Sequence, residues 1–213
     1  MVAKRRVAVL VSGRGSNMVA LHEASQDPDY PAEIVGVASD RSDAAALGIA
    51  TERGLAAKVV GRKDFADKVA HEAALVRTLE GWAPDYVCLA GYMRILSADF
   101  LGRWPGPVLN IHPSLLPSFP GLDTHRRALD GGVRIHGCTV HFVTPGVDEG
   151  PIVAQAAVPV LADDDEEALS RRVLREEHRL YPQALADVAS GAARLVGGRV
   201  VRRGSSGAVL ASE

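Results

Sequence analysis

Short apolar runs alternate with amphipathic stretches along the first half of the chain, and this order constrains the fold more than any other feature. The runs lack internal polar–apolar alternation, which is typical of strands covered on both faces. An amphipathic helix between two strands indicates a right-handed crossover and parallel pairing. The sequence therefore predicts an α/β fold with a doubly wound, mostly parallel, Rossmann-like sheet. The expected strands are Val7–Val11, Ile34–Ala38, Lys58–Val60, Tyr86–Ala90 and Val108–Ile111, and the expected helices are Asn17–Ala24, Asp43–Arg53, Phe65–Leu79 and Ala98–Arg103.

The pattern changes after Asn110. Residues 112–124 are rich in Pro and Gly and predict a long, specific loop. Two longer strands follow, with glycines and a proline between them, which indicates a C-terminal antiparallel extension of the sheet. A long helix and a terminal hairpin complete the chain. These last elements are expected at His136–Val143, Ile152–Val160, Glu166–Ala189 and Leu195–Val201.

The 213 residues suit one domain, which we expect over residues 1–203, with a flexible tail at 204–213. The hydrophobic share of 47% and charged share of 23% are those of an ordinary globular protein. A net charge of −2 gives no reason to expect binding to nucleic acid or to a membrane surface, so any anion must be held locally.

The cysteines and the N-terminus point to the cytoplasm. Cys88 and Cys138 lie in apolar runs and form no disulfide or zinc pattern, in keeping with a reducing compartment. Lys4, Arg5 and Arg6 precede an apolar run that is too short for a signal peptide or a membrane span. The better interpretation of that run is a first buried strand.

The segment Ser12–Asn17 follows the first expected strand and opens the first expected helix. Helix N-termini present backbone N–H groups and a positive dipole end, and glycines let the backbone approach an anion. One interpretation is a dinucleotide loop with Asp40 as the ribose acid, although the third glycine of that motif is missing and Val19-Ala20 stand near its place. A second is a cradle for a single phosphate closed by Ser16 and Asn17. A plain tight turn with a capping side chain is the third.

Asn110 and His112 are the strongest candidates for chemistry. Alternation along a strand places both on one face, at the carboxyl end where open α/β sheets bind ligands. An amide donor and an imidazole aimed at one point suit an oxyanion. Asp148, in the tight loop Thr144–Pro151, would favour the charged form of a neighbouring imidazole.

Each of these residues alone is more often structural, and their combination carries the prediction. The remaining histidines, among them His136 and His141, show no metal-binding spacing, so we expect no metal. A G-x-S-x-G nucleophile elbow is also absent from the sequence.

At these residues the sequence resembles the folate-dependent formyltransferases, and among them the phosphoribosylglycinamide formyltransferases. The similarity spans about residues 5–190. The catalytic-loop motif is shared by the wider family, whereas the first loop is typical of the purine-pathway members. The segments that carry it are Gly13–Asn17, Leu89–Leu96, Asn110–Pro117, Val140–Val143 and Asp148–Pro151.

The resemblance implies a role for each matching position. The catalytic residues would be Asn110, His112 and Asp148. The residues that bind the ribonucleotide substrate would be Gly15, Ser16, Asn17 and Glu177. The residues that bind the folate would be Arg62, Met93, Arg94, Ile95, Leu96, Asn110, Thr144, Pro145, Gly146, Val147 and Asp148. Residues 1–110 would form the phosphate-binding half, and residues 111–203 the folate-binding and catalytic half. Leu174 departs from the pattern, because some members have a polar substrate contact there.

The resemblance also implies the reaction: a transferase that moves the formyl group of 10-formyltetrahydrofolate to the amine of glycinamide ribonucleotide in purine biosynthesis. Its partners would be these small molecules, with a monomer or a homodimer as the assembly. The alternatives are another folate-dependent formyltransferase acting on an aminoacylated tRNA or an amino sugar, a formyltetrahydrofolate hydrolase, an NAD-binding oxidoreductase, and a non-catalytic nucleotide-binding module.

Overall fold

A computed structural model describes residues 3–104 and 107–203. The chain divides into two compact units, Met1–Asn110 and Ile111–Glu213. The described strands form a seven-stranded sheet in the order β3-β2-β1-β4-β5-β6-β7 and a separate two-stranded sheet, β8-β9. The predicted α/β class, with a mostly parallel sheet and a C-terminal antiparallel extension, is confirmed. The expected flexible tail lies outside the described residues.

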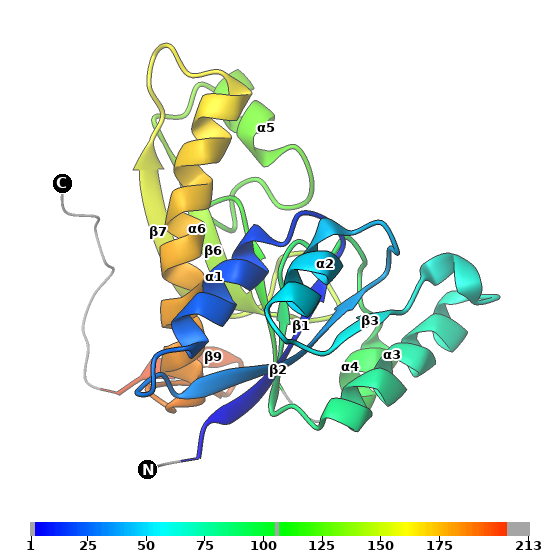
Figure 1. The fold of residues 1–213 in the computed structure, drawn as a ribbon. Coiled ribbons are helices and arrows are strands. Elements are labelled where there is room, and N and C mark those ends of the chain that lie inside the picture. The colour runs from blue at the N-terminus through cyan, green and yellow to red at the C-terminus, as the bar shows by residue number, and fades with distance from the viewer. Residues whose placement is uncertain (1–2, 105–106, 204–213) are drawn as a thin grey trace. The chain divides into compact units, whose positions relative to one another are not determined.

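The N-terminal unit is built on parallel strands, and Figure 1 shows β1 and β2 running side by side. Strand β1 lies between β2 and β4, and its residues 7–11 are completely buried. The chain adds β2 and β3 on one side of β1 and then returns to add β4 and β5 on the other. The β1–β4 boundary is therefore the switch point at which such sheets bind ligands. The strands are β1 (Arg5–Val11), β2 (Ala32–Ser39), β3 (Ala57–Val59), β4 (Tyr86–Leu89) and β5 (Val108–His112).

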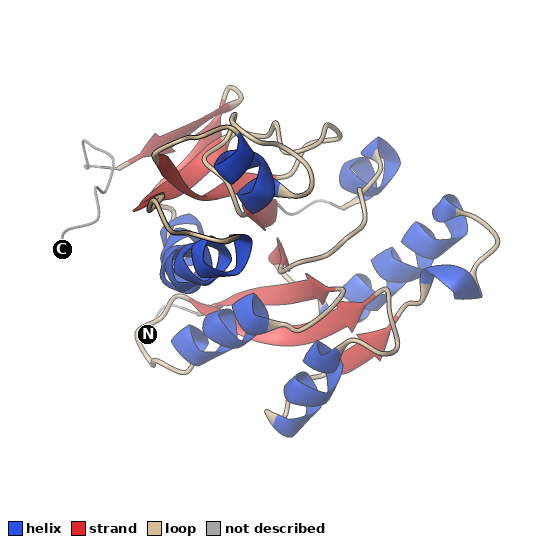
Figure 2. Cartoon of the chain, turned by 90° about the horizontal axis from the view of Figure 1, so that it is seen from above, coloured by secondary structure: helices blue, strands red, loops and turns tan. Residues whose placement is uncertain are grey.

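Helices flank both sides of the parallel strands in this unit (Figure 2). Right-handed crossovers account for this, because reversing the direction of strand addition at β1 moves the later helices to the opposite face. Helix α1 packs against α2, and α3 packs against α4. The helices are α1 (Ser16–Ser25), α2 (Ala45–Glu52), the 3-10 helix η1 (Arg62–Asp64), α3 (Lys68–Trp82) and α4 (Ala98–Arg103).

Helix α3 begins three residues later than its apolar spacing predicts. Phe65 is extended, and the chain turns into the helix at Asp67, whose carboxylate accepts a hydrogen bond from the Ala70 amide at 2.8 Å. An N-terminal cap of this kind satisfies one of the amides that the first turn leaves without a helical partner. The cap therefore sets the helix boundary, and apolar periodicity does not.

The C-terminal unit pairs β6 (Ile135–Phe142) with β7 (Ile152–Pro159) in antiparallel register, as expected. Helix α6 (Glu166–Ala189) packs on both strands and begins at its predicted residue, where the Asp165 carboxylate accepts from the Ala168 amide. The predicted terminal hairpin is present as β8 (Ala193–Val196) and β9 (Arg199–Arg202). The short helix α5 (Thr124–Asp130) was not expected from the sequence.

Candidate active site

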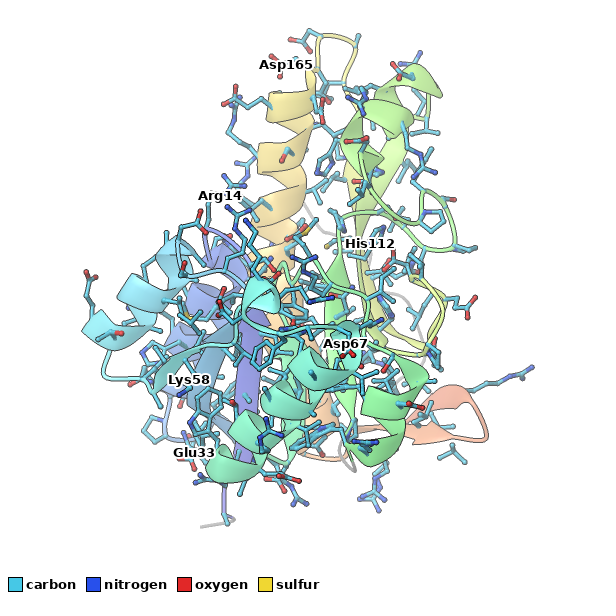
Figure 3. All side chains as sticks on the ribbon, turned by 90° about the vertical axis from the view of Figure 1, so that its right-hand side faces the viewer. Arg14, Glu33, Lys58, Asp67, His112 and Asp165 are labelled. Atoms are coloured by element: carbon cyan, nitrogen blue, oxygen red, sulfur yellow. The ribbon has the colours of Figure 1, made fainter. Side chains whose placement is uncertain are left out.

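The first loop leaves the carboxyl end of β1 and runs into α1. Figure 3 shows Arg14 of this loop and Glu33, at the start of β2, at opposite ends of the N-terminal unit. Helix α1 begins at Ser16, so the Ser16 and Asn17 amides lie in the first turn, where the helix itself offers them no acceptor. That geometry suits an anion.

Gly15 is required by this loop for two reasons. Its φ of 81° lies in the left-handed region, and a Cβ built there would come within 2.5 Å of the Ala46 Cβ on α2. The Gly13 carbonyl also accepts a hydrogen bond from the Ala46 amide at 3.1 Å. The loop is therefore packed closely against α2 and hydrogen-bonded to it.

Asn110 and His112 lie two residues apart on β5, as predicted. Asn110 is half-buried and pairs with Leu89 in the β4–β5 ladder. His112 is 5% exposed, and both of its ring nitrogens face oxygen atoms. Its Nδ1 lies 3.3 Å from an oxygen of the Asp148 carboxylate, and its Nε2 lies 3.0 Å from the Phe119 carbonyl.

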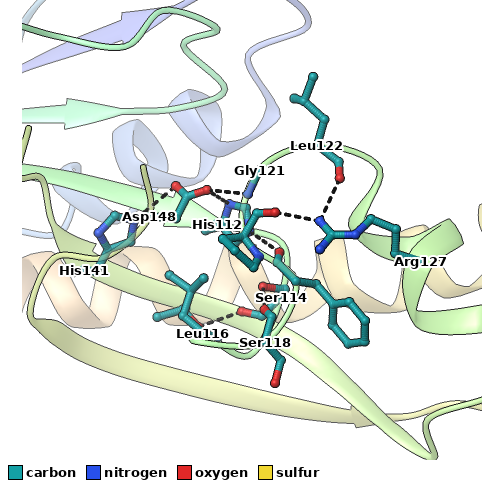
Figure 4. A network of polar contacts seen from close by, with 12 residues as sticks. His112, Ser114, Leu116, Ser118, Gly121, Leu122, Arg127, His141 and Asp148 are labelled. Atoms are coloured by element: carbon teal, nitrogen blue, oxygen red, sulfur yellow. Dashed lines mark hydrogen bonds and ion pairs between the residues drawn. The ribbon is translucent and has the colours of Figure 1, made fainter. Parts of the chain in front are cut away.

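The predicted partnership of His112 with Asp148 is thus present in the structure (Figure 4). The same Asp148 oxygen accepts a hydrogen bond from the Gly121 amide at 2.8 Å, and the other oxygen lies 3.8 Å from Nε2 of His141. A neutral imidazole can donate from only one nitrogen, whereas an imidazolium donates from both. An environment with an acceptor at each nitrogen therefore suits the charged ring.

The loop after β5 is fixed by buried polar contacts. The Thr139 hydroxyl donates to the Ser114 carbonyl at 2.6 Å and accepts from the Leu116 amide at 3.0 Å. The side-chain amide of Gln155 donates to the Leu116 carbonyl at 2.8 Å. These contacts join the loop to β6 and β7, so the segment that follows His112 is held by the antiparallel pair.

Helix α5 anchors the far part of the same loop. Arg127 donates from Nη1 to the carbonyls of Pro120, at 2.6 Å, and Leu122, at 3.2 Å, and its guanidinium lies 5.6 Å from the centre of the Phe119 ring. Because the Phe119 carbonyl and the Gly121 amide contact His112 and Asp148, Arg127 supports the pair indirectly.

The residues that the resemblance assigns to the folate lie in both units. In the N-terminal unit, Met93 and Ile95 are 63% and 59% exposed, whereas Leu96 is buried. Arg62 is half-buried in η1, where its Nη1 donates to the Phe65 carbonyl at 3.0 Å. Arg94 forms an ion pair with Asp40 at 2.7 Å.

The segment of residues 144–148 belongs to the C-terminal unit and follows β6. Val147 is 51% exposed, and Asp148 has a φ of 54°. A Cβ at Gly150 would lie 1.7 Å from the Phe142 carbonyl oxygen, so the chain can close back onto β6 only with glycine there. This tight return presents the Asp148 carboxylate to His112. Thr144, Pro145 and Gly146 form the rest of the segment.

Glu177 lies on the buried face of α6 and is 7% exposed. Leu174, one turn earlier, is half-buried. Glu177 is the one acid among the buried residues of α6, and its contact with the ribonucleotide stays a prediction.

His141 was not predicted to belong to the site, although its side chain approaches Asp148. Its Nδ1 lies 2.9 Å from the Phe142 carbonyl, and burial lowers the pKa of the ring. The ring centroids of two further histidines, His125 and His136, lie 5.3 Å apart. Burial lowers the pKa of both rings, to about 4 for His136. The position of His141 directly before the loop that presents Asp148 was the available signal.

Within residues 3–104 and 107–203, no three side chains of the His, Cys, Asp and Glu type are grouped closely enough to hold a metal ion. Among the helices in those ranges, none combines the length and apolar character needed to cross a bilayer.

Comparison with known proteins agrees with this geometry. Residues 5–185 match the family described as Formyl transferase. The phosphoribosylglycinamide formyltransferase of Escherichia coli is 42% identical over 185 residues, which cover 87% of each chain. The trifunctional purine biosynthetic protein adenosine-3 of Bos taurus is 49% identical over 192 residues, and these cover 90% of this chain but 19% of that protein. This chain therefore spans only a small part of its trifunctional relatives.

Solved structures give the same result. A glycinamide ribonucleotide transformylase from Symbiobacterium toebii superposes with a TM-score of 0.91 at 46% identity and covers 95% of each chain. A phosphoribosylglycinamide formyltransferase from Brucella melitensis is 57% identical, with a TM-score of 0.85 over 88% of this chain and 97% of that one. This chain therefore belongs to the formyl transferase family and, within it, to the phosphoribosylglycinamide formyltransferases.

Proposed function

We propose that this protein transfers the formyl group of 10-formyltetrahydrofolate to the amine of glycinamide ribonucleotide, giving the N-formyl product and tetrahydrofolate in purine biosynthesis. Family membership supports the reaction type. The single observation that carries the proposal is the buried His112–Asp148 pair at 3.3 Å, next to Asn110 on the same strand end. An amide donor and a charged imidazole are the groups that stabilise an acyl-transfer oxyanion.

The first loop fits the phosphate of the ribonucleotide. Its glycines leave room for close approach, and the amides of Ser16 and Asn17 stand at the positive end of α1. We assign Gly15, Ser16 and Asn17 to this phosphate, and Glu177 to the remainder of the ribonucleotide.

The side chains of Met93 and Ile95 are exposed and apolar, and covering them with an apolar ring of a ligand is favourable because it removes apolar surface from water. We assign the segment of residues 93–96, Arg62 and the segment of residues 144–148 to the folate, which supplies the formyl group when bound. The last segment would contribute mainly backbone contacts.

In the proposed mechanism the substrate amine adds to the formyl carbon, and negative charge develops on the formyl oxygen. Asn110 and the imidazolium of His112 donate hydrogen bonds to that oxygen. Nε2 of His112 must exchange its contact with the Phe119 carbonyl for one with the substrate. One donor of this kind is typically worth about 2.7–4 kcal/mol in the transition state.

Two protons must also move. The attacking amine loses one, and Asp148 is the acceptor, directly or through water. The folate nitrogen gains one as the carbon–nitrogen bond breaks, and His112 is the first candidate donor. No covalent enzyme intermediate is required, because orientation of the two substrates supplies much of the rate.

The test is a spectrophotometric assay of deformylated folate release, with glycinamide ribonucleotide and a 10-formyl folate as substrates. Release that requires the ribonucleotide would support the proposal. Release without an acceptor would identify a hydrolase, and release only with an aminoacylated tRNA or an amino sugar would identify a different formyltransferase. A protein that releases no folate but quenches nicotinamide fluorescence would be an oxidoreductase. Asn110→Ala should lower turnover by about two orders of magnitude with a small effect on substrate binding.

The cytoplasmic location and the monomeric or homodimeric state stay predictions from the sequence.

A further inference from the structure

Asp40 is a buried acid directly after β2, and the sequence leaves open that it binds the ribose of a dinucleotide. Its side chain is 1% exposed, and both carboxylate oxygens are engaged within the N-terminal unit. Oδ1 accepts a hydrogen bond from the Ser12 hydroxyl at 2.5 Å, and Oδ2 accepts one from Nε of Arg94 at 2.7 Å. A carboxylate held in this way is not placed to bind a ribose.

The contacts of Asp40 extend to a third segment. The Ser12 hydroxyl, while donating to Asp40, accepts a hydrogen bond from the Met93 amide at 2.9 Å. The Asp40 carbonyl also faces the Arg62 amide at 3.4 Å. One residue thus contacts the start of the first loop, the segment after β4 and the helix η1.

These contacts lie at the switch point of the sheet. Ser12 follows β1 and Met93 follows β4, which are neighbouring parallel strands with their carboxyl ends at the same edge. Both strands are followed by loops whose amides and side chains must keep a fixed spacing to hold two different ligands. Because the carboxylate is charged and desolvated, its hydrogen bonds are stronger than those between neutral groups.

We propose that Asp40 is a positioning residue that fixes the substrate-phosphate loop and the folate-binding segment relative to each other through Ser12, Met93 and Arg94. The inference rests on the proposed function for the identity of the two ligands. Asp40 contacts neither ligand; it holds the backbone that does, so its loss weakens the binding of both substrates and leaves the chemical step intact.

The test compares Asp40→Ala with the isosteric Asp40→Asn. Alanine removes both side-chain acceptors, and we expect the KM values for the ribonucleotide and for the folate to rise by roughly tenfold each, with kcat within about threefold of the wild type. Asparagine keeps an acceptor oxygen for Ser12 but turns an N–H group towards Nε of Arg94, so both KM values should lie between those of the wild type and those of the alanine variant. A large fall in kcat with unchanged KM values would overturn the proposal, as would alanine kinetics equal to those of the wild type.

The matched control is Asp164→Ala. Asp164 belongs to the C-terminal unit, is 3% exposed and pairs with Arg172 at 2.7 and 2.8 Å, so it is a similarly buried, arginine-paired acid. This variant should lose thermal stability without changing either KM. Equal KM increases in both variants would show a general effect of lost stability and would overturn the positioning role.

Amide hydrogen exchange tests the same inference without reference to activity. In Asp40→Ala, exchange should accelerate by about tenfold or more at Met93 and through residues 13–17, and Asp164→Ala should leave these amides unchanged. Unchanged exchange in Asp40→Ala would overturn the proposal whatever the kinetics. If the wild type transfers no formyl group to the ribonucleotide, the proposed function fails, and the exchange result alone decides whether Asp40 joins the two segments.

Discussion

Thr139→Val tests whether β6 holds the catalytic loop in place. Thr139 is completely buried on β6, and its hydroxyl donates to the Ser114 carbonyl and accepts from the Leu116 amide, two and four residues after His112. Valine has nearly the same shape, so the substitution removes the hydroxyl and leaves the packing almost unchanged. The loop would then have to reorganise or leave two polar groups buried without partners.

The magnitude follows from counting those groups. An unsatisfied buried donor or acceptor costs about 1–3 kcal/mol. The Gln155 side-chain amide also loses its 3.0 Å contact with the Thr139 hydroxyl, but it still donates to the Leu116 carbonyl. Two groups therefore lose the contacts described here altogether, the Ser114 carbonyl and the Leu116 amide. The expected loss is about 2–6 kcal/mol. For a domain of this size, 1 kcal/mol shifts Tm by roughly 2–4 °C, so 3 kcal/mol corresponds to about 6–12 °C.

Thr139→Ser is the matched control, because it keeps the hydroxyl and loses one methyl group, which is worth about 1 kcal/mol. Urea unfolding of the wild type and both variants gives the free energies, and steady-state assays give kcat. We expect the order of stability wild type, serine, valine, with a lower kcat for valine because His112 loses the support of its loop. A valine variant as stable as the serine variant would refute the argument that the hydroxyl holds the loop.

Three further outcomes are expected. Asp148→Asn should lower kcat by roughly 10²–10⁴-fold while both KM values stay within about threefold, measured by steady-state kinetics with the exposed Glu149→Gln as control. Gly15→Ala should raise the KM for the ribonucleotide by roughly tenfold, because alanine is strained at a φ of 81° and its Cβ would contact Ala46. Burial lowers the pKa of His136 from 6.5 to about 4, so the neutral ring contributes its full stability above pH 6.5. That contribution should be lost as the pH falls from 6.5 towards 4, so the urea midpoint of unfolding should decrease over this range. In His136→Gln the midpoint should depend less steeply on pH.

The sequence pattern was sufficient for the parallel sheet and for the pairing of His112 with Asp148. A short, uninterrupted apolar run rich in β-branched residues such as residues 7–11, ending at a glycine-containing turn, favours a strand covered on both faces, and these residues are completely buried. The prediction that Asn110 and His112 share one face required only the alternation of side chains along a strand. The partnership with Asp148 came from matching the loop motif, since no local rule relates residues 36 positions apart in the chain.

Features that depend on tertiary contacts were not predictable in the same way. Helix α5 has only seven residues and is flanked by the Pro- and Gly-rich loop before it and by Gly131-Gly132 after it, so its apolar pattern is too short to give a clear signal. Its anchoring residue Arg127 acts through carbonyls of the preceding loop, which no sequence motif encodes. His141 has an ordinary strand environment in the sequence, and only the return of the chain at Gly150 brings it close to Asp148.

Asp40 shows why an acid after the second strand is ambiguous. In a dinucleotide-binding fold that carboxylate must be open to solvent so that a ribose hydroxyl can reach it. Here the hydroxyl of Ser12 and the guanidinium of Arg94 occupy the same oxygens from within the protein. The two arrangements need the same residue at the same place in the fold, and they differ only in whether the carboxylate hydrogen-bonds to a ligand or to side chains of the protein. A serine directly after β1 and an arginine after β4 are therefore the features that separate them, and both can be read in a sequence once the contact is known.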